Sequence, residues 1–147
     1  METVARTNEV ERNIMREILF KAKRVDNGEW VEGLLTVMWG QYHMINPNDE
    51  NTAYPIDTET ICQYTGLADK NGNRIWENDI VEFPDCEMPT ESGYGDVFVN
   101  VGKVAYDTES MSYFFTNRVT VDMGDIIIKD EVEVIGNVFD NPELFED

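Results

Sequence analysis

The sequence contains few of the residues on which many protein functions depend. Its 147 residues include two Cys, one His and only 11 Lys and Arg, against 30 Asp and Glu, so the formal net charge is −19. Proteins that grip a nucleic-acid backbone do so mainly through Lys and Arg, so this charge excludes direct nucleic-acid binding. It also argues against an anionic membrane surface. We therefore expect neither nucleic acid nor a membrane to be a direct partner.

The cysteines and the hydrophobic runs point to the cytoplasm. Cys62 and Cys86 form no CxxC motif, and two cysteines cannot build a disulfide framework. Residues 1–13 lack the apolar segment of a secretory signal. No run reaches the roughly 18 apolar residues that a transmembrane helix needs. We expect both thiols to be reduced, small and partly buried.

No catalytic or metal-binding pattern is present. His43 is the one histidine, it lies in a predicted strand (42–45), and no nucleophile motif accompanies it. Zinc would need several Cys or His ligands at short spacing. The loop that begins at Asp69 has glycine at position 4 and Ile80 at position 12, so it fails the EF-hand pattern. We expect no enzyme, no catalytic, cofactor-binding or metal-binding residue, and no cofactor.

The first half of the chain has the pattern of a β-hairpin. Apolar and polar residues alternate over 18–23, Asn27-Gly28 follows, and residues 29–37 return as a second strand. Asn-Gly is typical of a type I′ turn, in which both central residues have positive φ. A third strand is expected at 42–45. Trp30, Trp39 and Trp76 could line a ligand groove, but core packing is the preferred interpretation.

The second half also predicts short strands separated by Gly, Asn and Pro. Apolar residues change parity at Gly102, which suggests a β-bulge or a sharp bend. Asn141 and Pro142 are expected to cap and begin one helical turn. The expected loops are 46–52, a second Asn-Gly turn at 69–73, and 84–95; the expected strands are 79–83, 97–106, 113–116, 126–128 and 131–139.

These elements predict a mainly β protein, α+β at most, of the sandwich or small-barrel kind. The charge is unevenly distributed along it. Residues 1–75 carry 12 acids and eight bases, whereas residues 76–147 carry 18 acids and three bases, a net charge of −15. The C-terminal half therefore supplies most of the electrostatic field.

Four stretches together resemble the YopX-like family of phage and prophage proteins. They are the segments MREILFKAKR with GEWVEG (15–24 and 28–33), IDTETICQYTGL (56–67), DKNGNRIWENDIV (69–81) and VIGNVFDNPEL (134–144). The resemblance covers about residues 15–145. The QYTGL, DKNG and NDIV segments are the most specific part of it.

The resemblance implies an SH3-like β-barrel or roll in the C-terminal two-thirds, self-association, and a bacterial host cytoplasm. It supplies no catalytic residues. The organisation expected from it is an N-terminal extension or short helix (1–14), a β-hairpin part (15–54) and the SH3-like barrel domain (55–147) with an acidic loop (84–96). The chain departs from the family pattern in three places: the acidic loop, the fourteen residues before Met15, and Asn78, where glycine is common. The second departure suggests that translation could also start at Met15.

Three functions remain open from the sequence. The first is a non-enzymatic phage module that forms homo-oligomers or binds a host protein. The alternative is an acidic nucleic-acid mimic that occupies the basic cleft of a host DNA-binding or defence enzyme, since charge steers such encounters. The third is a carboxylate-metal hydrolase. High negative charge also simply keeps proteins soluble, which is the plainer reading of the composition.

Overall fold

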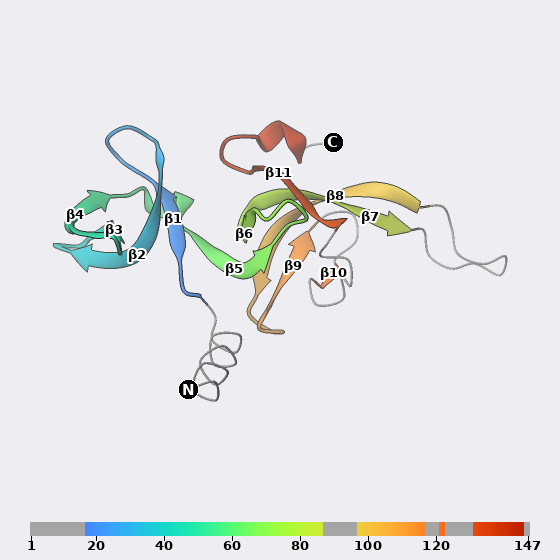
Figure 1. The fold of residues 1–147 in the computed structure, drawn as a ribbon, viewed down its shortest axis with the longest axis horizontal. Helices are drawn as coiled ribbons and strands as arrows, with labels where there is room; N and C mark the ends of the chain where they lie inside the picture. The colour runs from blue at the N-terminus through green and yellow to red at the C-terminus, as the bar shows by residue number, and fades with distance from the viewer. Residues whose placement is uncertain (1–16, 87–96, 117–120, 123–130, 146–147) are drawn as a thin grey trace, which may run out of the picture. The chain divides into compact units, whose positions relative to one another are not determined.

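The computed structural model describes residues 17–86, 97–116, 121–122 and 131–145. Their regular elements are β-strands and short 3₁₀ turns, which confirms the mainly β prediction (Figure 1). The chain divides into two compact units, Met1–Gly66 and Leu67–Asp147. The predicted extension (1–14), the strand at 126–128 and most of the acidic loop (84–96) lie outside the described residues.

The first unit is an antiparallel sheet whose strands follow one another as hairpins (blue to green in Figure 1). Its strand order is β4-β3-β2-β1-β5, and the boundary between the units falls within β5. The elements are β1 (Phe20–Lys23), β2 (Trp30–Met38), β3 (Gln41–Asn46), β4 (Asp49–Pro55), the 3₁₀ turn η1 (Thr58–Thr60) and β5 (Cys62–Ala68).

The predicted first hairpin is confirmed, but its turn is of another kind. β1 and β2 pair from Phe20 opposite Gly33 to Lys23 opposite Trp30. The connection is closed by the Arg24 N–H, which donates to the Glu29 carbonyl at 2.9 Å, and only Gly28 within it has positive φ. A type I′ turn would need two such residues in succession. The Asn-Gly pair therefore ends a longer loop.

The strands of the first unit curl so that the end of β4 returns to the end of β1. Arg24 forms a β-bridge with Ile56, and the Val25 N–H donates to the Pro55 carbonyl at 3.0 Å. Because β4 already begins at Asp49, the loop predicted over 46–52 is shorter than expected. The core enclosed by these strands consists of Ala22, Met44 and Ile56, against which Phe20, Val31, Leu35 and Ile61 pack.

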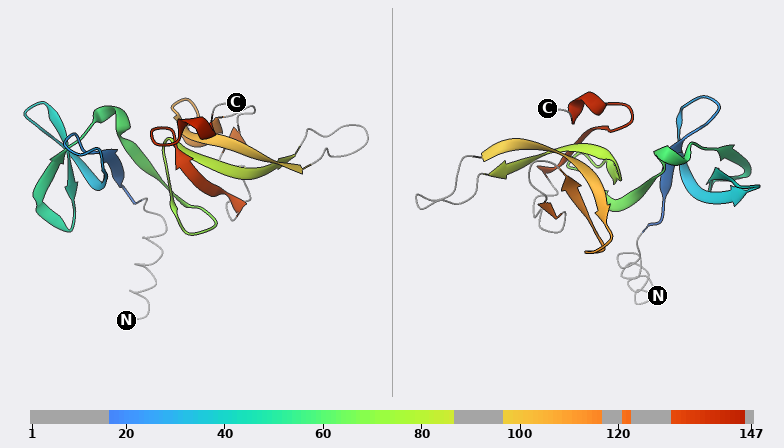
Figure 2. Two further views of the ribbon diagram at one scale, coloured as in Figure 1. Left: turned by 90° about the horizontal axis from the view of Figure 1, so that it is seen from above. Right: turned by 180° about the vertical axis from the view of Figure 1, so that it is seen from behind.

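The second unit contains a five-stranded antiparallel sheet with the order β10-β9-β8-β7-β11 (Figure 2). Among the described residues β10 and β11 remain at opposite edges, so the predicted barrel is not closed. Its core is Ile75, Val81, Phe83, Val104, Phe115 and Val132. The elements are β6 (Arg74–Trp76), β7 (Asp79–Cys86), β8 (Val97–Asp107), β9 (Ser112–Thr116), β10 (Val121–Asp122), β11 (Glu133–Asn137) and the 3₁₀ turn η3 (Pro142–Leu144).

β7 is longer than predicted because it continues through Pro84. The predicted loop starts at Pro84, but that residue pairs with Val99 of β8 and the strand ends at Cys86. Proline cannot donate a ladder hydrogen bond, so it is tolerated only where one side of a strand is unpaired. In the described residues the pairing of β7 with β11 stops at Glu82, which leaves that side free at Pro84.

The β-bulge predicted at Gly102 is absent. β8 pairs with β7 in one continuous register from Val97 to Lys103. The buried residues Asn100, Gly102 and Val104 share one face, so the parity never changes. The apparent phase slip arose because the sequence places valines on the outward face and a polar residue and a glycine on the inward one. A register shift does occur in β11, between Val134 and Gly136.

Two local features explain residues of the family pattern. Asn78 has φ 68°, in the left-handed region that glycine enters freely and asparagine tolerates better than most residues. This conformation suits the glycine that the resemblance leads us to expect at this position. The predicted helical turn is confirmed as η3, but the Asn141 side chain does not cap it. Its Oδ1 instead accepts from the Asn137 N–H at 3.3 Å.

Candidate functional site

A depression opens in the first unit where the ends of β1, β3 and β4 meet. Its volume is about 640 Å³. The lining combines bases, one acid, an amide and apolar groups. The fold brings these residues together from three connections, which are β1–β2, β2–β3 and the segment after β4. The lining residues are Lys23, Arg24, Val25, Gly28, Gly40, Gln41, Tyr42, Ile56, Asp57 and Thr58.

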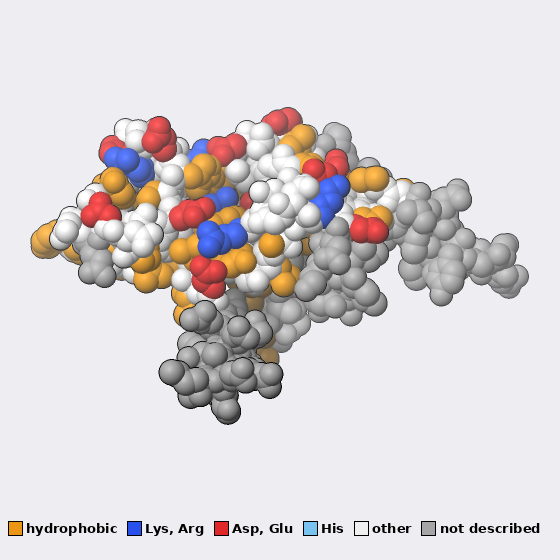
Figure 3. Space-filling model, in the orientation of Figure 1, with side chains coloured by type: hydrophobic (Ala, Val, Ile, Leu, Met, Phe, Trp, Pro, Cys, Tyr) orange, Lys and Arg blue, Asp and Glu red, His pale blue; other side chains and the backbone are white. Residues whose placement is uncertain are grey.

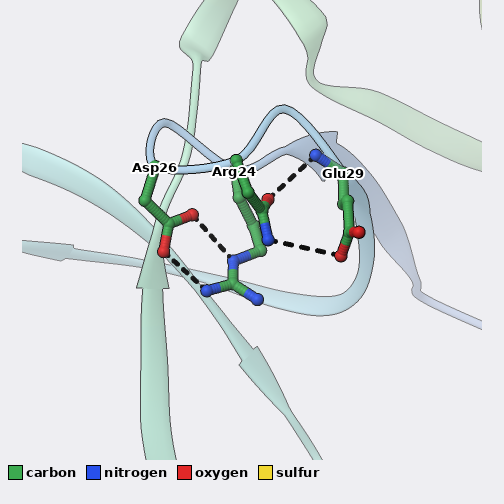
Figure 4. A network of polar contacts seen from close by, with 4 residues as sticks. Arg24, Asp26 and Glu29 are labelled. Atoms are coloured by element: carbon green, nitrogen blue, oxygen red, sulfur yellow. Dashed lines mark hydrogen bonds and ion pairs between the residues drawn. The ribbon is translucent and has the colours of Figure 1, made fainter.

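Arg24 is oriented at this depression by an ion pair and an aromatic ring. Its guanidinium donates from Nε and Nη2 to the two Asp26 carboxylate oxygens, at 3.0 and 2.6 Å (Figure 4). It also lies 4.1 Å from the centre of the Tyr54 ring. The hydrogen bond from Arg24 is the main cause that lowers the pKa of the Asp26 carboxyl, and the same bond raises the pKa of Arg24. Both groups therefore stay charged at neutral pH, and the guanidinium is pre-oriented.

The opposite wall is fixed by the segment that precedes β5. The Thr60 hydroxyl donates to the Asp57 carbonyl at 2.7 Å and accepts from the Lys23 N–H at 2.8 Å. The Asp57 side chain accepts from the Glu59 N–H at 3.1 Å. The Gln41 amide donates to the Ile56 carbonyl at 3.1 Å. These bonds fix the backbone of the segment that forms this wall.

Beside the depression, β2 and β3 are joined by the two-residue turn Trp39-Gly40. Met38 pairs with Gln41, and both turn residues have positive φ, 50° and 76°. These are the features of a type I′ turn, in which Asn-Gly, Asp-Gly or Gly-Gly is strongly preferred. Trp39 therefore occupies a position that is unfavourable for a bulky side chain. Its side chain is also 95% exposed.

The row of apolar side chains on the core-facing side of β2 and β3 extends beyond the core toward this turn. Leu35 and Met44 face each other in the core of the unit. One step along, Val37 and Tyr42 are paired on the same face but are 55% and 41% exposed. Figure 3 shows hydrophobic side chains exposed at this outer end of the hairpin, on the left. We call Val25, Val37, Trp39 and Tyr42, with the adjoining depression, the Trp39 surface.

A second hollow lies in the other unit, and three of the four charged residues that line it are acidic. Its volume is about 310 Å³, and Glu82 and Glu133 face each other across β7 and β11 in it. Lys70 forms an ion pair with Glu133 at 3.3 Å. Like charges directly opposite in a sheet are unfavourable, and the lysine offsets part of that repulsion. The lining residues are Lys70, Glu82, Phe83, Pro84, Val99, Glu131 and Glu133.

The three tryptophans have three different surroundings. Trp76 is buried, as predicted. Trp30 is half-buried, and the ammonium groups of Lys21 and Lys23 lie 4.7 and 5.4 Å from its ring centre. The prediction of core packing is wrong for Trp39, which is exposed. The alternating residues on both sides of Trp39-Gly40 were the available signal for a turn, but the identity of the first turn residue argued against it.

His43 and Cys62 have local structural roles. His43 is half-buried, and its Nδ1 lies 2.9 Å from the Gln41 carbonyl. Cys62 is a fully buried thiol whose Sγ lies 3.3 Å from the Thr60 carbonyl, so it is more deeply buried than the partial burial that we expected. The side chain of Cys86 lies outside the described residues. None of these contacts assembles a nucleophile with a base.

The loop that starts at Asp69 is a turn in which the aspartate is buried and residues 70–73 are exposed. The Asp69 carboxylate accepts from the backbone N–H groups of Asn71, Asn73 and Val134 at 2.8 to 3.0 Å. Burial raises its pKa, but these hydrogen bonds outweigh burial and hold the pKa below 3.8. Within the described part of the chain, no three His, Cys, Asp or Glu side chains are grouped to hold a metal ion. The carboxylate-metal hydrolase therefore has no candidate site there.

Comparison with known proteins places the chain in a family. The sequence model of the YopX protein family matches residues 19–146, nearly the whole chain. The chain belongs to the YopX family. No curated protein matches it. A structure similar to it is the crystal structure of protein EF1440 from Enterococcus faecalis, at 23% identity and a TM-score of 0.53, with 90% of this chain and all of that one covered. This likeness concerns the fold.

The segments typical of the YopX family hold backbone together in this structure. Asp69 and Asp79 accept backbone N–H groups in two successive turns, and Asn137 accepts from the N–H groups of Phe139 and Asp140. These hydrogen bonds give the residues that make them a structural role. Val25, Val37, Trp39 and Tyr42 lie outside the segments, whereas Lys23, Arg24 and residues 56–58 of the adjoining depression lie within them. No helix in the described residues is long and apolar enough to cross a membrane.

Proposed function

We propose that this YopX protein is a non-enzymatic, phage-encoded β module that acts in the bacterial cytoplasm by binding protein. The bound protein is either a further copy of the chain or a host protein. Short strands joined by tight turns suit such a role, because a rigid scaffold presents its turns at fixed positions.

The observation that carries this proposal is Trp39. An exposed tryptophan loses the free energy of burial, and its left-handed backbone costs about 1–2 kcal/mol more. Both the exposure and the backbone strain of Trp39 are unfavourable in the free protein. Its presence is explained if the side chain is buried when a complex forms. Tryptophan is also enriched among the residues that dominate protein interfaces.

The test compares the wild-type chain with Trp39→Asn, which retains a residue suited to the turn. Self-association is measured by sedimentation over a range of concentrations, and host proteins are captured on the same two baits during phage expression. We expect an assembly, either homomeric or with a host protein, that Trp39→Asn weakens at least tenfold. If neither kind of assembly depends on Trp39, the proposal is wrong.

A second function is favoured by the acidic hollow of the other unit. Residues 67–147 carry 19 acids and five bases, and Glu82, Glu131 and Glu133 line one hollow. Such a field would steer the chain to the basic cleft of a host DNA-binding or defence enzyme. Capture of a DNA-binding partner in a low-salt wash and its loss in a high-salt wash would support this function. A partner retained equally in both washes would contradict it.

A further inference from the structure

We propose that Asn71 is a site of spontaneous deamidation in the folded protein, and that Asn27, which is also followed by glycine, is protected from the same reaction. The fold thus directs this modification to one of two sites with the same dipeptide sequence. Neither asparagine belongs to the Trp39 surface, so the inference is independent of the proposed protein-binding function.

Deamidation joins the asparagine side chain to the backbone nitrogen that follows it. This nitrogen attacks Cγ and forms a C–N bond while its proton passes to water, and the side-chain nitrogen takes up a proton and leaves as ammonia. Water then opens the cyclic imide at either carbonyl, which gives aspartate or isoaspartate. Glycine favours the attack, because it has no Cβ to obstruct the approach. The net change is the hydrolysis of one amide to one carboxylate, and it requires no oxidant or cofactor.

The two Asn-Gly pairs have closely similar backbone surroundings. Gly28 and Gly72 both have positive φ, 72° and 82°. The Gly28 N–H donates to the Arg24 carbonyl at 2.9 Å, and the Gly72 N–H donates to the Asp69 carbonyl at 3.0 Å. Both asparagines are exposed. The attacking nitrogen is held to a similar degree in the two turns, so we attribute a difference in rate to the asparagine side chains.

The side chain of Asn27 is held at both ends. Its Oδ1 accepts from the Glu29 N–H at 2.9 Å, and its Nδ2 donates to the Glu29 carboxylate at 3.2 Å. During cyclisation the amide nitrogen has to leave and the carbonyl has to turn into the ring, so both bonds have to open. Each bond that opens lowers the population of the reactive conformer, and a bond to a charged acceptor lowers it most.

The side chain of Asn71 is held weakly by comparison. Its Nδ2 lies 3.4 Å from Oε1 of Glu133, and among the described residues this is its one side-chain hydrogen bond. The reactive conformer is therefore reached more easily than at Asn27. We expect deamidation at Asn71 to be about tenfold faster, which is the effect of roughly one or two hydrogen bonds.

Deamidation at Asn71 also changes the charge of the second unit. The new carboxylate replaces a hydrogen-bond donor that faces Glu133, an acid that already lies opposite Glu82. The like charges repel, which weakens a contact between residues 62 positions apart. Isoaspartate in addition lengthens the backbone of the turn that begins at Asp69. We therefore expect deamidated chains to unfold at a lower urea concentration than intact chains.

The experiment incubates the full chain at neutral pH, once in buffer and once in concentrated guanidinium chloride. Peptide mapping by mass spectrometry follows the deamidation of Asn27 and Asn71 with time. We expect an about tenfold faster reaction at Asn71 in buffer and nearly equal rates in denaturant, where the hydrogen bonds of both turns are lost. Equal rates in buffer, a faster reaction at Asn27, no reaction at either site, or the same ratio in denaturant would each overturn the inference.

Glu29→Ala tests the protection of Asn27 directly. Glu29 is exposed, and its truncation removes the carboxylate acceptor while the backbone N–H remains. Asn27 should then react several-fold faster, and the rate at Asn71 should not change. An unchanged rate at Asn27 in this variant would also contradict the proposal.

Asn71→Asp reproduces the charge of one product without the lengthened backbone. Its urea midpoint should lie below that of the wild type, and that of the isoaspartate form should be lower still. A midpoint equal to or above that of the wild type would show that the new charge does not weaken the contact with Glu133.

Discussion

At the scale of single residues, the polar side chains that the sequence makes most visible stabilise the fold. Asp69 begins the DKNG segment, and its carboxylate joins that turn to Val134, 65 residues later. A carboxylate that accepts several backbone N–H groups is stabilised in its charged form, and the loss of one partner leaves buried donors unsatisfied. Asp69, which begins the loop that faintly resembles a calcium site, therefore has a structural role as an acceptor of backbone hydrogen bonds.

Asp69→Asn should lower the free energy of unfolding at neutral pH by about 1–3 kcal/mol, because one amide oxygen replaces two carboxylate oxygens. The folded-state pKa of Asp69 lies below its ordinary value of 3.8, so its stabilising contribution is complete above pH 3.8 and declines as the pH falls through the folded-state pKa. Urea titrations above and below pH 3.8 should show the two proteins converge in acid.

Asp26→Asn is the matched control, because this carboxylate also has a lowered pKa but is exposed. Its effect on unfolding should be much smaller, as is usual for surface ion pairs. An equal loss in the two variants would contradict the structural role assigned to Asp69.

At the scale of elements, both long strands change partner beside a buried glycine. β2 pairs with β1 up to Gly33 and with β3 from Leu34 onward. β8 pairs with β7 up to Lys103 and with β9 from there onward, and Gly102 lies at the exchange. Glycine allows close approach where a strand bends from one neighbour to the next. The sequence predicted a β-bulge or a sharp bend at Gly102; the bulge is absent, and the strand changes partner there.

The two glycines should differ in their tolerance of a methyl group. A Cβ at Gly33 would lie 2.2 Å from the backbone oxygen of Ile45, which cannot move aside. A Cβ at Gly102 would lie 3.0 Å from the Phe115 Cβ and 3.2 Å from a ring atom of Phe83, so these neighbours would have to shift by only a few tenths of an ångström. We expect Gly33→Ala to cost about 3 kcal/mol or more and Gly102→Ala about 1 kcal/mol in urea unfolding. Equal costs would contradict this account.

In the β2–β3 turn, by contrast, we expect a substitution to stabilise the fold. Trp39→Asn places a residue preferred in type I′ turns at φ 50° and removes an exposed apolar side chain. Unfolding of this variant should require about 1 kcal/mol more free energy than that of the wild type. Thermal or urea unfolding measures this. A destabilised variant would show that Trp39 serves the fold, and would remove the main support for a binding surface.

At the scale of the whole molecule, charge is the dominant feature. The net charge is −19, and residues 67–147 account for −14 of it. Repulsion of this size lowers the stability of a compact state, and here it includes like charges placed face to face, as at Glu82 and Glu133. Composition alone fixes the total, but only the pairing of β7 with β11 brings these two acids together.

Stability should therefore rise with salt. The screening length falls from about 30 Å at 0.01 M to about 3 Å at 1 M, so added NaCl removes most of the repulsion. We expect the urea midpoint to increase over this range. Chloride is the appropriate anion, since sulfate stabilises most proteins by exclusion from their surface. An unchanged or lower midpoint would show that the acids are already compensated in the folded chain.

The sequence by itself determined the mainly β architecture, the first hairpin and the acidic character, because alternation, turn residues and charge are local properties. It also placed the chain in its family through turn segments whose hydrogen bonds are mostly local. Only the tertiary structure decided that Asp69 is an acceptor for Val134, that β8 runs without a bulge, and that Trp39 is exposed next to a depression lined by Arg24 and Tyr42. Each of these depends on contacts between residues far apart in the chain, which no local pattern encodes.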